Sequence, residues 1–269
     1  LMLAYLIGLF TFIPFVSETL EKEIIGTAAT VLFSSFIGIV DDVYETRWRI
    51  KILTPLIGGV PLAVMRLGRT TMWIPGFREP VDFGILFYFL ILPFIVTACA
   101  NAVNMFAGLN GLEAGSAAII TLTLSFLCLL KGGKQLTGAI LLIPFLGALI
   151  AFLLYNKYPS RVFPGDVGTF GMGSVIACSA MLANLERAIF IMFIPHTINA
   201  VLFFVGKLRG EAPPREASMN PDGTIPAPTI WSLRCLLLQV RPMKEKTLVY
   251  MMWMIVAAFS ILGALVYGI

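Results

Sequence analysis

ACANAVNMFAGLNGLEAGSAA, residues 98–118, is the stretch that decides how this chain folds. It lies in a strongly apolar chain, yet it carries Asn101, Asn104, Asn110 and Glu113 close together. An amide without a hydrogen-bond partner costs several kcal/mol in hydrocarbon. These four side chains must therefore face protein or a wet cavity rather than lipid.

The composition of the whole chain indicates a membrane protein. Of its 269 residues, 58% are hydrophobic and 13% are charged, whereas soluble domains are about 25% charged. The net charge of +4 is scattered over many loops, which does not suggest a nucleic-acid-binding protein. We therefore predict an all-α polytopic membrane protein.

Apolar runs of about 17–25 residues can cross a bilayer as helices. They predict nine transmembrane helices, at residues 1–16, 24–40, 52–66, 84–100, 112–130, 137–155, 168–184, 187–205 and 247–268. We interpret residues 1–269 as one integral-membrane domain. Within it, the proline-rich segment 206–246 is a long loop with short strands or an interfacial helix. The chain begins inside an apolar run without an initiator methionine, so we expect it to be N-terminally incomplete.

The loops of alternating helices fall on two faces of the membrane. One set, 41–51, 101–111, 156–167 and 206–246, holds twelve of the nineteen Lys and Arg residues, and the other set holds seven. The positive-inside rule places the first set in the cytoplasm. Every unusual polar cluster of the chain is in this set, so we expect a single site on the cytoplasmic face.

Two acids and a group of cations belong to the first of these clusters. Asp41 and Asp42 end the second predicted helix, where acids oppose the helix dipole and do not stabilise the helix. They are either a solvated loop pair or a functional pair that binds Mg²⁺ or takes up a proton. Arg47, Arg49 and Lys51 follow, as an ordinary positive-inside loop or as a phosphate-binding patch at headgroup depth.

The asparagines of the opening stretch have a structural and a functional interpretation. Asn101 and Asn104 share one helix face and either hydrogen-bond between helices or offer amide oxygens to Mg²⁺. Asn110 and Glu113 form a variant of the capping box, with Asn110 at the N-cap and Glu113 three residues later. A helix N-terminus starting there would face the cytoplasm and attract an anion.

The third cluster surrounds a Pro-Gly-Asp sequence. Asp166 is part of a plain turn, the N-cap of the next helix, or a functional carboxylate. Phe163 is an interface aromatic or a stacking platform for a base. His196, the only histidine, lies in an apolar run, so we expect it to be a buried, hydrogen-bonded side chain and not part of a zinc or Ser-His-Asp site. Together, hard ligands, cations and glycine-rich loops suit Mg²⁺ with phosphates, one on a lipid and one on a soluble nucleotide.

Three of these segments are recognisable as motifs. GIVDDVYETRWRIK (38–51), NAVNMFAGLNGLEAG (101–115) and NKYPSRVFPGDVGTFGMG (156–173) resemble the polyprenyl-phosphate N-acetylhexosamine-1-phosphate transferase superfamily. The resemblance covers essentially the whole chain and is closest to the archaeal and eukaryotic UDP-N-acetylglucosamine–dolichyl-phosphate N-acetylglucosaminephosphotransferase branch. It implies a ten-helix fold with a cytosolic site and Mg²⁺ (or Mn²⁺) as cofactor. The lipid phosphate would attack a UDP-sugar and UMP would leave, which is the first step of lipid-linked glycan assembly.

The resemblance also implies roles for individual residues. Asn104 and Asp166 would bind the metal, Lys51 the lipid phosphate, and Gly108, Asn110 and Phe163 the uridine. Asp41 and Asp42 would be the family's aspartate pair, as a proton acceptor or as organisers of the lysine and metal. Arg215 would neutralise the diphosphate, and we expect Asn101 and Glu113 beside the diphosphate or sugar. Eukaryotic members carry Arg-His-Arg where this chain has Arg215, Glu216 and Ala217, in a loop that helps to choose the sugar.

The alternatives are a membrane transporter with a phosphate or metal site at its cytoplasmic face, and a non-catalytic scaffold. The expected partners are a UDP-sugar, a polyprenyl or dolichyl phosphate and the lipid bilayer, without nucleic acid. A homodimer is left open. An archaeal protein would lie in the plasma membrane and a eukaryotic one in the endoplasmic reticulum.

Overall fold

A computed structural model describes residues 1–44, 47–74, 79–211, 220–221, 223–227 and 229–268. These residues form helices, with two small two-stranded antiparallel sheets beside them. In one sheet β1 (Thr71–Met72) pairs with β2 (Val81–Asp82), and in the other β3 (Thr224–Ile225) pairs with β4 (Met243–Lys244). The prediction of an all-α membrane protein is confirmed.

Six helices of the described chain are long and apolar enough to cross a membrane. They are α2 (Glu18–Tyr44), the π-helix Phe87–Ile91 continued by α5 (Leu92–Phe106), α6 (Leu112–Lys131), the 3-10 turn Gly133–Gln135 continued by α7 (Leu136–Asn156), α8 (Gly165–Leu182) and α12 (Glu245–Gly268). The pair α9 (Glu186–Met192) and α10 (Ile194–Arg209) is apolar enough when taken together but bends by 55° at the break between them, which is the geometry of a broken span or of a re-entrant loop.

Three of the nine predicted helices are not continuous in the structure, and the bent pair α9 and α10, at the predicted helix 187–205, is one of them. The first is α1 (Met2–Phe10) with a 3-10 turn, Ile13–Phe15. The segment 52–66 is divided among α3 (Trp48–Leu53), a 3-10 stretch (Thr54–Gly59) and α4 (Val60–Val64). Pro55 and Pro61 each start a new piece, because proline lacks the N–H that a continuous helix needs.

The central helix is α8, which packs against α2, α5, α6, α7 and α9 and is buried over residues 168–182. Two glycines bring backbones close together. A Cβ on Gly38 of α2 would lie 2.5 Å from the backbone of Val167, and one on Gly173 would lie 2.5 Å from the backbone of Ala100 on α5. Small residues at such crossings let membrane helices approach closely. The three motif-bearing helices are therefore held in a tight register.

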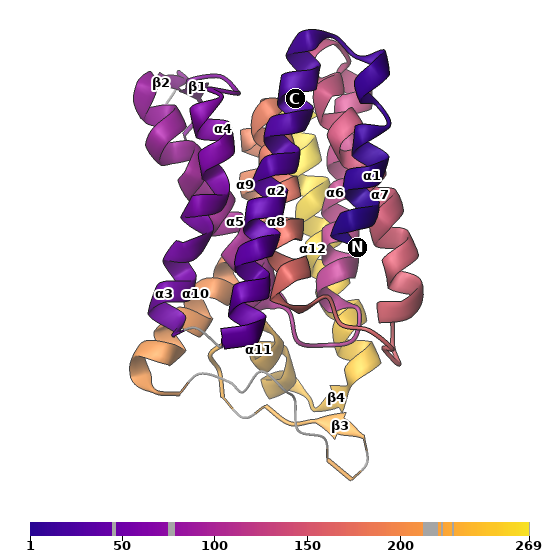
Figure 1. Ribbon diagram of the computed structural model, residues 1–269. Helices are drawn as coiled ribbons and strands as arrows, with labels where there is room; N and C mark the ends of the chain where they lie inside the picture. The colour runs from indigo at the N-terminus through magenta and orange to yellow at the C-terminus, as the bar shows by residue number, and fades with distance from the viewer. Residues whose placement is uncertain (45–46, 75–78, 212–219, 222, 228, 269) are drawn as a thin grey trace.

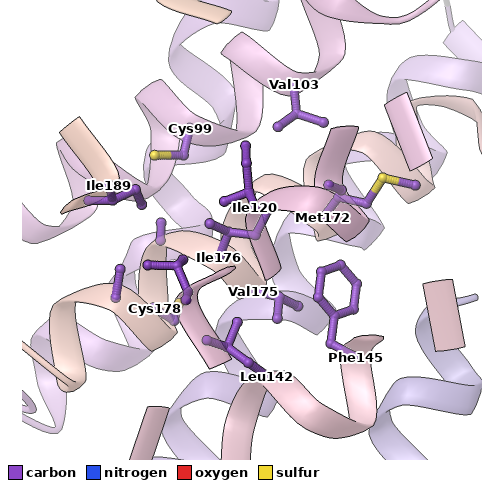
Figure 2. Close-up of a cluster of buried hydrophobic side chains, with 14 of the residues drawn as sticks. Cys99, Val103, Ile120, Leu142, Phe145, Met172, Val175, Ile176, Cys178 and Ile189 are labelled. Atoms are coloured by element: carbon purple, nitrogen blue, oxygen red, sulfur yellow. The ribbon is translucent and has the colours of Figure 1, made fainter. Parts of the chain in front are cut away.

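The hydrophobic core is formed by the buried apolar side chains of the same helices. Figure 2 shows Cys99 and Val103 of α5, Ile120 of α6, Phe145 of α7 and Ile176 of α8 converging in one cluster. Because this core is closely packed, it sets the positions of the polar helix ends beyond it.

One end of the molecule collects the polar segments. Figure 1 shows α3, α11 (Leu233–Val240), β3 and β4 at the same end as the last turn of α2, whereas β1 and β2 lie at the opposite end. The prediction that the four polar clusters share one face is confirmed. Within 206–246, the described residues form the end of α10, β3, α11 and β4, as expected for a loop with short strands and a helix.

Candidate active site

A cavity of about 790 Å³ opens at this end of the helix bundle. The predicted site residues that line it are Asp41, Asp42, Lys51, Asn101, Asn104, Gly108, Glu113, Phe163 and Asp166. They come from α2, α3, α5, α6 and α8 and from the connections before α6 and α8. Residues far apart in sequence thus meet in one cavity, as the sequence predicts.

Lys51 joins two carboxylates in this cavity. Its ammonium contacts both the Asp41 and the Asp166 side chains. All three side chains are at most 12% exposed, so the charges are poorly screened by water and removal of one of them is costly. Asp41 is therefore not a solvated loop acid, because it holds α2, α3 and α8 together through Lys51.

Asp42 caps a helix that it does not belong to. Its carboxylate accepts the backbone N–H of Asp166 at 3.0 and 3.1 Å and that of Val167 at 3.3 Å. These are the first-turn donors that an N-cap side chain accepts, and the N-cap residue of α8, Pro164, makes no such bond. The acid that opposes the dipole at the end of α2 thus stabilises the start of α8.

The Pro-Gly-Asp sequence fits around that contact. Gly165 has φ +62°, and a Cβ there would lie 2.7 Å from the Asp42 carboxylate. The interpretation of Asp166 as an N-cap is wrong, because the helix begins at Gly165 and Asp166 lies inside the first turn. Its side chain is left to face Lys51 and the cavity.

The two asparagines of α5 both point inward, as their spacing predicts. Asn104 Nδ2 donates to Asp166 Oδ1 at 2.6 Å and to Thr169 Oγ1 at 2.8 Å. Asn101 Nδ2 donates to the backbone carbonyls of Ile52 at 3.1 Å and Thr97 at 3.0 Å. Asn104 is thus tied to the Asp166 carboxylate, while Asn101 anchors α3 to α5 at the cavity wall.

Asn110 is placed differently from the other predicted residues, because it does not line the cavity. Its Nδ2 donates to Glu245 at 2.5 Å and its Oδ1 accepts the N–H of Ser160 at 2.7 Å. The predicted capping box is wrong, since Gly111 with φ +77° is the N-cap of α6 and no side chain caps it. The Asn110 amide instead joins three chain segments below the cavity.

Glu113 is 1% exposed and lines the cavity, and its Oε2 has no hydrogen-bond partner among the described residues. A buried carboxylate oxygen of this kind needs a donor. Phe163, in contrast, is 55% exposed at the cavity rim, which leaves its ring face open to stacking. Arg215 lies outside the described residues.

The structure adds residues that the sequence analysis missed. Asn199 of α10 donates from Nδ2 to the carbonyl of Met105 at 2.7 Å and accepts the N–H of Leu233 at 3.0 Å. The other missed lining residues include Thr169, Phe203, Phe204, Lys207, Ser232 and Arg234. Asn199 lies in an apolar run, so the argument applied to Asn101 could have identified it. His196 is buried as expected, 4.1 Å from the ring centroid of Phe106, but its Nδ1 has no partner in the described chain.

The oxygen donors suit a hard cation such as Mg²⁺, because carboxylate and amide oxygens are its usual protein ligands. The carboxylates of Asp41 and Asp166 already meet around one cation, the ammonium of Lys51. Among the described residues no three His, Cys, Asp or Glu side chains form a metal site by themselves.

Comparisons with known proteins lead to the same region of the chain. A family model described as glycosyl transferase family 4 matches residues 24–184, which include all three motifs. A putative UDP-N-acetylglucosamine–dolichyl-phosphate N-acetylglucosaminephosphotransferase of Sulfolobus acidocaldarius is 32% identical over 96% of this chain and 79% of its own length.

Two further relatives extend the range of organisms. The enzyme of the same name from Dictyostelium discoideum is 33% identical over 86% of this chain and 65% of its own length. A phospho-N-acetylmuramoyl-pentapeptide-transferase of Chlorobaculum parvum is 33% identical over 66% of this chain and 54% of its own length.

Proposed function

The chain belongs to glycosyl transferase family 4, and we propose that it transfers N-acetylglucosamine 1-phosphate, or a related phosphosugar, from a UDP-sugar to a polyprenyl or dolichyl phosphate. This reaction would be the first step of lipid-linked glycan assembly. An oxygen of the lipid phosphate forms a bond to the β-phosphorus of the UDP-sugar. The bond between that phosphorus and the oxygen bridging to the α-phosphate breaks, and UMP leaves.

The observation that carries this proposal is the convergence of Asp41, Lys51, Asn104 and Asp166 in one cavity at one end of the helix bundle. The names of the relatives from Sulfolobus acidocaldarius and Dictyostelium discoideum support the same substrates. A transporter would place its polar groups near the middle of the membrane, whereas these lie at helix ends.

We assign Mg²⁺, or Mn²⁺, to Asn104 and Asp166, which line the cavity and carry the amide and carboxylate oxygens that such a cation binds. Asn104 would turn its Oδ1 toward the ion in place of the Nδ2 that donates to Asp166 in the structure. Such an ion would offset the charge of the diphosphate. Lys51 is the cation nearest to this pair and would stabilise negative charge as it develops in the transition state. A dedicated proton acceptor matters less, because a phosphate monoester is already mostly ionised at pH 7.

The nucleotide would lie along the wall formed by Gly108 and Phe163, both of which line the cavity. The exposed Phe163 ring can stack on uracil, and such stacking is worth about 1–3 kcal/mol per base. Asn110 would shape this wall from behind through Glu245 and Ser160. The excess of Lys and Arg in the loops at this end supports a site that faces the cytoplasm. It would lie under the plasma membrane of an archaeon or at the endoplasmic reticulum of a eukaryote.

The test uses the full-length protein in membranes with Mg²⁺, dolichyl phosphate and labelled UDP-N-acetylglucosamine. We expect UMP and a labelled lipid in equal amounts. Asp166→Asn should abolish both products, whereas Asp82→Asn, an exposed carboxylate on β2 at the opposite end, should leave them unchanged. UMP without labelled lipid, or an unaffected Asp166→Asn variant, would contradict the proposal.

A further inference from the structure

The charged side chains that line the cavity come from different helices, and the buried Glu113 of α6 is one of the acids. Asp41, Asp42, Asp166 and Lys51 lie on the wall formed by α2, α3 and α8. Lys51 already contacts two of these carboxylates, so this wall carries a net negative charge. Such a wall repels a phosphate unless cations elsewhere in the cavity offset it.

The other two described cations that line the cavity are Lys207 and Arg234. Lys207 is in the last turns of α10, and Arg234 is in the first turn of α11. Asn199 of α10 fixes α11 against α10 by accepting the N–H of Leu233 at 3.0 Å. Ser232 caps α11 by accepting the N–H of Cys235 at 3.2 Å. The two cations are therefore carried on anchored helices at one wall.

Lys207 lines the cavity, whereas the next cation of the same helix, Arg209, does not. Arg209 lies two residues further, on nearly the opposite helix face, and packs 4.9 Å from the ring centroid of Trp231. Lys207 lies 5.8 Å from the ring centroid of Phe203, which does line the cavity.

We propose that Lys207 and Arg234 form a second anion-binding subsite, which holds a phosphate group of the substrate on the wall of the cavity formed by α10 and α11. The inference rests on the proposed function for its choice of ligands. The phosphate is either that of the lipid acceptor or the diphosphate of the nucleotide sugar. Both are anions to which ammonium and guanidinium groups donate charge-assisted hydrogen bonds.

The experiment compares Lys207→Met and Arg234→Met with Arg241→Met, which removes an exposed cation just beyond α11 that does not line the cavity. Calorimetry measures UDP-sugar affinity without turnover, and initial rates measure the KM for dolichyl phosphate at saturating UDP-sugar. Loss of a charged hydrogen bond should weaken binding roughly tenfold or more. The salt dependence of that binding should also become shallower, because a charge is lost.

A weaker UDP-sugar affinity places the diphosphate in the subsite, and a raised lipid KM alone places the lipid phosphate there. Lys207→Arg and Arg234→Lys should restore most of the affinity, which a variant with a damaged fold would not do. Affinities and KM values equal to those of Arg241→Met would overturn the inference. Wild-type protein that binds the UDP-sugar through Lys207 but makes no labelled lipid would instead contradict the proposed function alone.

Discussion

Replacing Asp42 by alanine removes the acceptor for the first-turn N–H groups of α8, the helix that carries Asp166. Replacing it by asparagine keeps an oxygen in the same place but removes the charge. The two variants therefore separate a capping role for Asp42 from a role as the base that takes a proton. A base loses its function in both variants, whereas a cap is lost only in the alanine variant.

The expected sizes follow from the contacts. Loss of an N-cap costs about 0.5–2 kcal/mol, and loss of a charge at a helix N-terminus costs about 0.3–1 kcal/mol. Asp42→Ala should thus destabilise the first turn of α8, and with it the position of Asp166, by about 1–3 kcal/mol. At 1.4 kcal/mol per factor of ten, turnover falls by about five- to 150-fold. Asp42→Asn loses only the charge, so its turnover should fall by roughly two- to fivefold.

Initial rates of UMP release and labelled-lipid formation check this, with each variant's thermal unfolding midpoint in detergent measured beside them. Asp42→Asn should stay close to wild type in both readouts. Loss of a general base costs about 10²–10⁴-fold. If both variants lose turnover by this factor and keep the wild-type midpoint, Asp42 transfers a proton and the capping argument is refuted.

Three further results are expected. Lys51→Met leaves two buried carboxylates without their cation and should destabilise the fold by about 3–5 kcal/mol; a thermal midpoint as high as that of Lys51→Arg would argue against this. Gly38→Ala forces a Cβ to 2.5 Å from the backbone of Val167 and should cost about 1–3 kcal/mol. A Cβ on Gly147 would have no neighbouring atom within 4 Å, so Gly147→Ala is the control and should be neutral. Asn199→Leu leaves the carbonyl of Met105 and the N–H of Leu233 without their hydrogen-bond partner, at about 1–3 kcal/mol each. Amide hydrogen exchange in α11 should therefore become faster, and unchanged protection would show that Asn199 does not anchor α11.

The composition and the spacing of apolar runs predicted the membrane fold and the positions of its long helices. Hydrocarbon cannot satisfy polar groups, so Asn101 and Asn104 had to point inward wherever their helix packed. The same rule, with alternating helix direction, predicted that the four polar clusters share one end. Pro55 and Pro61 are visible in the sequence, but the helix 52–66 was predicted from the length of its apolar run alone. That criterion does not register the breaks that the two prolines cause.

The sequence by itself therefore determined the class of protein, the common face of its motifs and nine of the residues that line the cavity. Only the tertiary structure decided which partner each polar group takes. Asp42 caps α8, Asn110 binds Glu245 and Ser160, and Lys207 and Arg234 join the cavity. Local spacing favoured a capping box at Asn110, but a side chain bonds to whichever donor the packed helices bring nearest. That choice is made between segments 50 to 135 residues apart, where sequence periodicity carries no information.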